Sequence, residues 1–235
     1  MLKREREHLM IKLVIFDAGD VLYKGSKKEM VREVVSSFLA KHGVKDLEKA
    51  LKIGGEVWSR VEKLVKIGKM SLREAHEKWI EALGLNRKLV SEWSEIEKSE
   101  IRFKLFKRTP HVNETLKILK RKYKLAILSD TVLSKEEMIQ KLQALKIDYK
   151  LFDEIFTSHD IGYEKPHKEA YLTVLRYFNV RPEEAVFVGH AKDEIEGAKK
   201  IGLTTVVFAD KNVEGDYFVK QFDDLPKILD KTISP

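Results

Sequence analysis

Ile15-Phe16-Asp17-Ala18-Gly19-Asp20-Val21-Leu22 is the stretch that decides the fold. It continues a short apolar run, Lys12–Phe16, that contains β-branched residues and stops at an aspartate. Runs of this kind are typical of strands covered on both faces of a sheet. In an open parallel sheet, ligands gather at the carboxyl ends of the strands. The stretch therefore predicts a buried first strand with the Asp17 carboxylate at its functional end.

Four more segments carry the strand pattern, and helical patterns separate most of them. The expected strands are Lys124–Leu128, Leu151–Phe156, Ala185–Val188 and Thr204–Phe208. The expected helices are Val112–Arg121, one opened by the capping box at Ser134, one following Pro166, and Lys192–Ile201. Strand–helix alternation predicts an α/β fold, a Rossmann-like, doubly wound parallel sheet with helices on both faces.

The segment from Lys24 to about Phe106 contains helical patterns and no strand pattern. Its features include a capping box at Ser71 and apolar residues at helical spacing. We therefore predict an all-helical cap domain at 24–106, inserted into a core domain made of 1–23 and 107–235. Trp58, Trp79 and Trp93 fall in this block, and we interpret them as helix packing, with a pocket-lining role as the alternative.

Composition narrows the class of protein. The chain has 235 residues, 43% hydrophobic and 35% charged, and no apolar run approaches the roughly 20 residues of a membrane span. The absence of cysteine excludes disulfides and thiolate chemistry. The formal charge of +7 comes from basic residues that alternate with acidic ones, so we expect no nucleic acid and no membrane partner. We expect a cytoplasmic protein, and its Lys, Arg and Glu content fits a hot environment. Oligomeric state is left open.

Polar clusters follow the expected strands or precede the helix near residue 167. They are Asp17–Asp20, Ser129–Thr131, Gly162–Pro166 and Gly189–Glu194. Because the carboxyl ends of parallel strands share one edge of the sheet, these clusters should meet there. The sequence predicts a site that combines carboxylates, a hydroxyl and an ammonium.

In this order, the clusters resemble the four motifs of the haloacid dehalogenase (HAD) superfamily of hydrolases. The first is Ile15–Leu22, the second Ile127–Asp130, the third Gly162–Tyr171, and the fourth runs from Val188-Gly189 to Gly202. The likeness covers about Lys12 to the C-terminus, and the helical block matches the helical (C1-type) cap of one HAD class. Each motif alone is weak evidence for the family, whereas the order of the four motifs along the chain is specific to it.

The resemblance implies roles for the site residues. Asp17 would attack phosphorus and form an aspartyl-phosphate. Lys165 would pair with Asp17 and with the phosphoryl group, which Ser129 and Asp130 would help to bind. Asp17, the backbone carbonyl of Gly19, and Asp193 and Glu194 would hold a divalent ion. Mg²⁺ is the expected ion because it prefers hard oxygen ligands, with Mn²⁺ or another divalent ion as the alternative.

Two departures from the family pattern bear on mechanism. Most HAD phosphatases carry a second aspartate two positions after the nucleophile, where this chain has Gly19. We hypothesise that Asp20 takes part of the acid–base work. In the fourth motif, His190 replaces the usual first acid. Imidazole is a poor Mg²⁺ ligand, so we expect His190 to hydrogen-bond and orient the loop, with metal ligation as the alternative.

Three functions remain open from the sequence. The leading hypothesis is a metal-dependent phosphohydrolase acting on a small phosphorylated metabolite. The second is a metal-independent 2-haloacid dehalogenase, which also lacks the second acid of the first motif. The third is a HAD protein that binds phosphate ligands with little turnover, for which the missing acid and His190 are the reasons.

Overall fold

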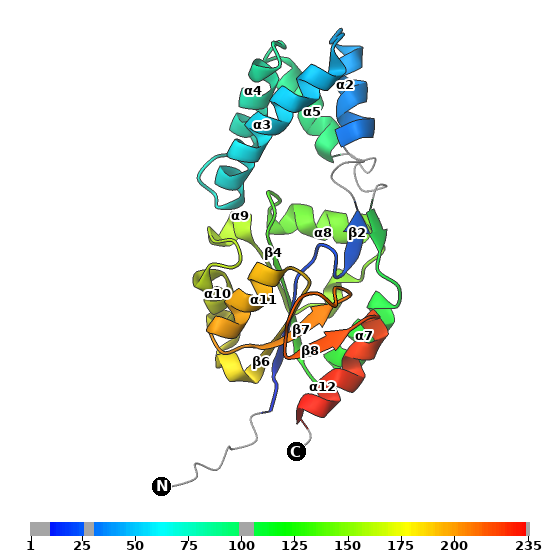
Figure 1. The fold of residues 1–235 in the computed structure, drawn as a ribbon, viewed down its shortest axis with the longest axis vertical. Helices are drawn as coiled ribbons and strands as arrows, with labels where there is room; N and C mark the ends of the chain where they lie inside the picture. Colours follow the sequence, from blue (N-terminus) through cyan, green and yellow to red (C-terminus); the bar gives the residue numbers. More distant parts are fainter. Residues whose placement is uncertain (1–9, 26–30, 99–105, 234–235) are drawn as a thin grey trace.

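A six-stranded, all-parallel sheet forms the centre of the protein (Figure 1). The computed structural model describes residues 10–25, 31–98 and 106–233. The strands lie in the order β5 (Glu154–Thr157), β4 (Lys124–Ser129), β1 (Leu13–Phe16), β6 (Ala185–Gly189), β7 (Thr204–Phe208) and β8 (Tyr217–Val219). The strand β1, which Asp17 directly follows, therefore lies in the interior of the sheet, between β4 and β6.

Alternating side chains of the strands pack on opposite faces of the sheet. In β1, Val14 and Phe16 belong to one apolar core, and Leu13 and Ile15 belong to another. The first core is covered by α7 (Val112–Lys120), α8 (Lys135–Ala144) and α12 (Leu225–Ile233), and the second by α10 (Lys168–Phe178) and α11 (Lys192–Lys200). Burial on both faces explains why the central strands are continuous apolar runs.

Short turns complete the core. They are α9 (Ser158–Ile161) and the 3₁₀ turns η2 (Tyr149–Leu151), η3 (Pro182–Glu184) and η4 (Phe222–Asp224).

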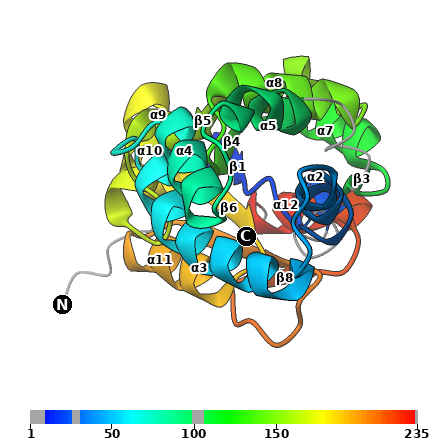
Figure 2. The ribbon, with the colours of Figure 1, turned by 90° about the horizontal axis from the view of Figure 1, so that it is seen from above.

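A block of helices sits above the carboxyl edge of the sheet (Figures 1 and 2). It consists of the π-helical turn η1 (Val31–Val35), α2 (Ser36–Lys41), α3 (Leu47–Lys66), α4 (Leu72–Ala82) and α5 (Leu89–Lys98). The block has its own apolar core, which includes Phe38, Trp79 and Trp93. Below it, β2 (Tyr23–Gly25) pairs with β3 (Phe106–Arg108) as an antiparallel ribbon. We propose that 24–106 is the cap domain and that 1–23 and 107–235 form the core.

The parallel sheet with helices on both faces is confirmed, as are the capping boxes at Ser71 and Ser134. The expected strand Leu151–Phe156 was placed too early. Asp148 accepts a hydrogen bond from the Lys150 backbone N–H (3.3 Å) and caps a 3₁₀ turn, so the strand begins only at Glu154. The three-residue strands were missed. Among the described residues, no helix combines the length and the apolar character needed to cross a membrane.

An ion pair fixes the start of β1 against the start of β6. The Lys12 ammonium donates to Glu184 Oε1 at 2.6 Å, and the backbone N–H of Arg181 donates to Glu184 Oε2 at 2.9 Å. The Lys12 backbone N–H also donates to the Glu184 carbonyl (2.8 Å). The hydrogen bond from the Lys12 ammonium, and after it those from Arg181, lower the pKa of the Glu184 carboxyl from the ordinary 4.5 to about 2.

We expect Glu184→Gln to destabilise the protein at neutral pH and to matter less in acid. A carboxyl whose pKa is depressed by folding contributes stability above its unfolded pKa, and that contribution is lost as the pH falls toward its folded pKa. The difference in urea midpoint between wild type and variant should therefore shrink between pH 4.5 and pH 2. Glu183→Gln, at the exposed neighbour, is the matched control. A difference that stays constant down to pH 2 would refute the role of the Glu184 charge.

Candidate active site

The polar ends of three adjacent strands meet at one edge of the sheet. Asp17 directly follows β1, Ser129 ends β4, and His190 directly follows β6. Since β4, β1 and β6 are neighbours in the sheet, the three side chains are brought together at its middle. They line a cavity of about 350 Å³ between the sheet edge and the helical block. The sequence prediction that these clusters share one edge is confirmed.

Lys165 lies at the centre of this edge, with its side chain fully buried. Its ammonium is 2.8 Å from Asp17 Oδ1, 3.4 Å from Glu194 Oε1 and 3.7 Å from Asp130 Oδ2. It also donates to the Leu128 carbonyl at 2.9 Å. Three carboxyl groups thus surround one ammonium, so the cluster has more acidic than basic groups and is suited to accept a further cation.

Burial and the shared ammonium set the protonation of this cluster. Burial alone would raise the pKa of Asp17, but the charge of Lys165 and the close contact with His190 hold it below its ordinary value. Burial raises the pKa of Asp130, and it raises the pKa of Glu194 to about 7. Burial would lower the pKa of Lys165, yet the three carboxylates raise it, so Lys165 stays charged. An ionised Asp17 beside a permanent cation is the arrangement that a carboxylate nucleophile needs.

The loop that carries Lys165 is held from two sides. On one side, the Lys165 backbone N–H donates to Asp130 Oδ1 at 3.0 Å. On the other, Pro166 packs so closely on α11 that a Cβ at Gly197 would lie 2.7 Å from the Pro166 Cβ. The Tyr171 hydroxyl donates to the Glu194 carbonyl (2.7 Å) and fixes the first turn of α11. Sequence reasoning missed the positioning roles of Gly197 and Tyr171. A glycine inside a helix was the available signal for Gly197.

His190 bridges two acidic residues of the first motif. Its Nδ1 is 3.3 Å from Asp17 Oδ2, and its Nε2 is 3.6 Å from Asp20 Oδ2. The contact with Asp17 is the main reason that the pKa of His190 is raised. Asp20 itself is exposed and has a left-handed backbone (φ 55°), a conformation that aspartate tolerates better than most residues. Gly19 lines the cavity, and a Cβ placed on it would meet no atom within 4 Å.

Asp17, His190 and Glu194 form a candidate cation site. One ligand atom from each lies within 4.8 Å of the others. Glu194 Oε2 is buried and has no hydrogen-bond partner among the described residues, so it is an acceptor that a cation would satisfy. Two carboxylates and one imidazole fit a divalent ion. The carboxylates suit Mg²⁺ or Mn²⁺, whereas the imidazole suits later transition metals, so the donor set does not select one ion.

The predicted metal ligands differ in where they lie. Asp17 and Glu194 converge with His190, for which ligation was the alternative expectation. Gly19 lies at the cavity wall beside them. Asp193 is exposed, and its Oδ1 accepts a hydrogen bond from the Glu194 backbone N–H at 3.0 Å. Of the predicted substrate-binding residues, Ser129 and Asp130 line the cavity.

We expect Mg²⁺ or Mn²⁺ to raise the melting temperature of the wild type, because an ion that binds only the folded state stabilises it by about 2.7 kcal/mol at 100 times its Kd. Glu194→Gln should remove this shift, since it removes one of the two carboxylates that converge on the site. The exposed neighbour offers a matched control, and Asp193→Asn should keep the shift. If the metal-induced shift in melting temperature were lost in Asp193→Asn and kept in Glu194→Gln, Asp193 and not Glu194 would be the metal ligand. The measurement is thermal unfolding with each metal and with EDTA.

Comparison with protein families gives a match over most of the chain. The family model described as haloacid dehalogenase-like hydrolase matches residues 11–202. This range includes all four polar clusters and the helical block.

Several curated relatives are phosphatases by name. The chain is 30% identical over 202 residues to the glyceraldehyde 3-phosphate phosphatase of Methanocaldococcus jannaschii, covering 84% of each chain. It is 29% identical to the enzyme of the same name from Pyrococcus furiosus, covering 94% of this chain and 92% of that one. It is also 33% identical to the phosphorylated carbohydrates phosphatase of Thermotoga maritima, over 47% of this chain and 50% of that one.

Solved structures share the architecture. A 2-haloacid dehalogenase from Pseudomonas syringae superposes with a TM-score of 0.71 at 21% identity, covering 94% of this chain and 99% of that one. A HAD phosphatase from Thermococcus onnurineus gives a TM-score of 0.67 at 23% identity, covering 93% and 98%. At these identities, the likeness establishes the fold and leaves the reaction open.

Proposed function

The chain belongs to the haloacid dehalogenase-like hydrolase family, and from that premise we propose that it is a divalent-metal-dependent phosphatase that works through an aspartyl-phosphate on Asp17. The observation that carries the proposal is the Asp17 carboxylate held between a buried ammonium, 2.8 Å away, and a cluster of candidate cation ligands. The phosphatase names of relatives that align with most of this chain support it.

The reaction requires a carboxylate to approach an anionic phosphate. Asp17 attacks phosphorus, the bond from phosphorus to the ester oxygen breaks, and the alcohol leaves with a proton. Water then attacks the aspartyl-phosphate and releases inorganic phosphate and free Asp17. Lys165 supplies a fixed positive charge beside Asp17, and the Ser129 hydroxyl donates to a phosphoryl oxygen. A divalent ion held by Asp17, Glu194 and His190 would supply further positive charge against the repulsion between the two anions.

Asp20 is the proposed proton carrier for the leaving alcohol. It lies beside the site, with its Oδ2 3.6 Å from His190 Nε2. Its side chain is 57% exposed, so it can exchange protons with water. The position that carries this group in most HAD phosphatases is Gly19, and the open space above Gly19 leaves room for a substrate oxygen to approach Asp20.

We expect the wild type to hydrolyse p-nitrophenyl phosphate with Mg²⁺ or Mn²⁺ and to lose turnover with EDTA. Asp17→Asn should reduce kcat by at least about 10³-fold, because an amide cannot form the acyl phosphate. The assay is nitrophenolate release. Asp193→Asn is the control, because Asp193 takes no part in the proposed attack on phosphorus. Turnover retained in Asp17→Asn would contradict the assignment of Asp17 as the nucleophile. Inactivity with every metal would contradict the phosphatase and favour the dehalogenase or the phosphate-binding protein. Halide release from a 2-haloacid would then distinguish these two.

We expect Asp20→Asn to slow hydrolysis of glycerol 3-phosphate far more than hydrolysis of p-nitrophenyl phosphate. An alkoxide needs a proton as it leaves, whereas nitrophenolate does not, and general acid catalysis contributes about 10² to 10⁴-fold. The measurement is kcat for both esters in wild type and Asp20→Asn. Gly19→Asp, for which the cavity has space, should restore the alkyl ester rate in the double variant. An equal effect of Asp20→Asn on both esters would refute the proton-carrier role.

A further inference from the structure

One wall of the cavity is a single face of α3, and its character changes along the helix. The lining residues recur at intervals of one, three and four positions, as expected for one helical face. From the start of the helix they are Ala50, Leu51, Gly54, Gly55, Trp58, Glu62 and Lys66. The first five are uncharged and the last two are charged. Over these 16 positions the helix rises about 24 Å, so the cavity wall has an apolar end and a charged end.

The charged end of α3 lies nearer the core (Figure 1). Beyond this end, a Cβ at Gly68 would lie 3.1 Å from the carbonyl oxygen of His159 in α9 of the core. The apolar end extends away from the sheet into the helical block (Figure 1). The cavity therefore extends from the residues at the sheet edge, such as Asp17 and Ser129, to the mostly apolar side chains of the helical block.

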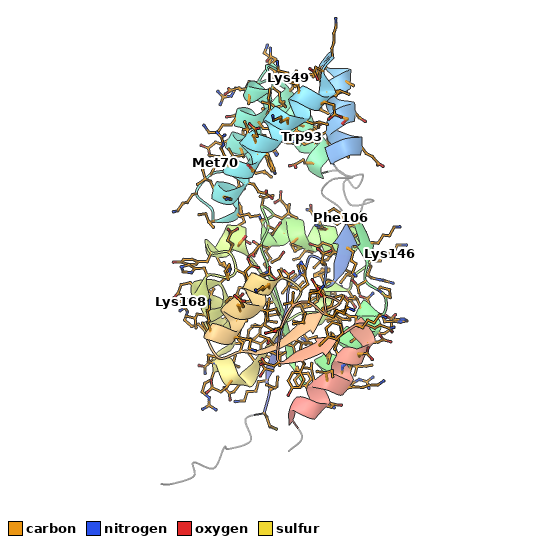
Figure 3. All side chains as sticks on the ribbon, viewed as in Figure 1. Lys49, Met70, Trp93, Phe106, Lys146 and Lys168 are labelled. Atoms are coloured by element: carbon orange, nitrogen blue, oxygen red, sulfur yellow. The ribbon has the colours of Figure 1, made fainter. Side chains whose placement is uncertain are left out.

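Aromatic rings line the cavity from the helical block and from the top of the core. The rings that line the cavity come from both the block and the ribbon below it, and they are Tyr23, Trp58, Trp79, Trp93 and Phe106. Trp93 lies among the helices of the block, and Phe106 lies below it at the top of the core (Figure 3). Trp79 and Trp93 also pack on each other, with ring centroids 4.8 Å apart. The three tryptophans thus serve both helix packing and the cavity wall, and the two sequence interpretations do not exclude each other.

Two adjacent glycines interrupt the middle of α3 for different reasons. Gly54 has a packing reason, because a Cβ there would lie 2.7 Å from Trp79 Nε1. Gly55 has none among the described residues, because a Cβ there would meet no atom within 4 Å. Glycine inside a helix is less stable than alanine, so packing does not account for Gly55. Gly55 is exposed and lines the cavity, so it leaves open volume at the cavity wall.

We propose that the substrate is a phosphomonoester whose leaving group carries a bulky aromatic ring, seated over Gly55 and between the cavity's aromatic rings. This inference rests on the proposed function for the phosphate end. A cavity of about 350 Å³ falls at the lower end of the roughly 300–1,000 Å³ of ligand pockets. A polar triose, as in the names of the relatives, would leave the apolar wall without a partner.

Binding of inert analogues tests the ring site separately from turnover. The ligands are 2-(1-naphthyl)ethylphosphonate and ethylphosphonate, which share the anionic end and differ in the ring. By calorimetry with Mg²⁺, we expect the wild type to bind the naphthyl ligand about 10-fold or more tightly, since small apolar differences in a fitted pocket have effects of this size. Equal affinities would overturn the inference.

Gly55→Leu fills the proposed ring position and should abolish the preference while leaving ethylphosphonate affinity unchanged. Arg60→Leu places the same side chain on an exposed part of α3 outside the cavity and should keep the preference. Thermal unfolding verifies that Gly55→Leu is folded. Gly55→Ala, the smaller change, should melt at a higher temperature than the wild type and show a reduced preference. A preference kept in both Gly55 variants would overturn the inference.

Turnover separates failure of the inference from failure of the proposed function. We compare kcat/KM for 2-(1-naphthyl)ethyl phosphate and glycerol 3-phosphate, which are both esters of primary alcohols and have similar intrinsic reactivity. A preference of about 10-fold or more for the naphthyl ester supports the inference. Hydrolysis of both at equal efficiency keeps the phosphatase and overturns the aromatic leaving group. Naphthyl phosphonate binding without hydrolysis of either ester keeps the ring site and overturns the phosphatase.

Discussion

A buried ammonium must remain charged, and the arrangement of the core around Lys165 follows from this constraint. Removing such a group from water is costly unless opposite charges and hydrogen bonds replace the lost solvation. Here Asp17, Asp130 and Glu194 supply the charges and the Leu128 carbonyl supplies a hydrogen bond. These groups come from different parts of the sequence. The sheet brings them to one point because β4, β1 and β6 are neighbours in it.

The same cluster connects stability with chemistry. One ammonium cannot neutralise three carboxyl groups. Burial, together with the charges of Asp17 and Asp130, raises the pKa of Glu194 to about 7. The surplus of acid is unfavourable for the protein alone and becomes favourable when a cation or a cation-bound anion enters. A site of this kind binds its ligands partly because it is electrostatically incomplete without them. Asp17 has the shortest contact with Lys165, and of the three carboxyl groups it is the one whose pKa is lowered.

Much of this architecture could be predicted from the sequence, because buried parallel strands leave unbroken apolar runs and capping boxes leave a four-residue signature. The neighbourhood of Asp17, Ser129 and Lys165 followed from the rule that strand ends share an edge. The direct contact between His190 and Asp17 did not follow, since it depends on how the His190 side chain leaves the strand. The exposure of Asp193 beside buried Glu194 was equally hidden, because adjacent residues at a helix start point in different directions. The strand β8 was too short to leave a pattern.

The β2–β3 ribbon would allow the helical block to be exchanged during evolution without disturbing the core. The polypeptide leaves the core at Gly25 and returns at Phe106, and these two residues are paired partners in the ribbon. Partners in an antiparallel pair lie about 5 Å apart, so a two-residue turn could close the ribbon in place of the whole block. Exchanging one block for another would leave the register of every core strand unchanged. A lineage could therefore replace the helical block by recombination while inheriting the polar edge of the sheet intact.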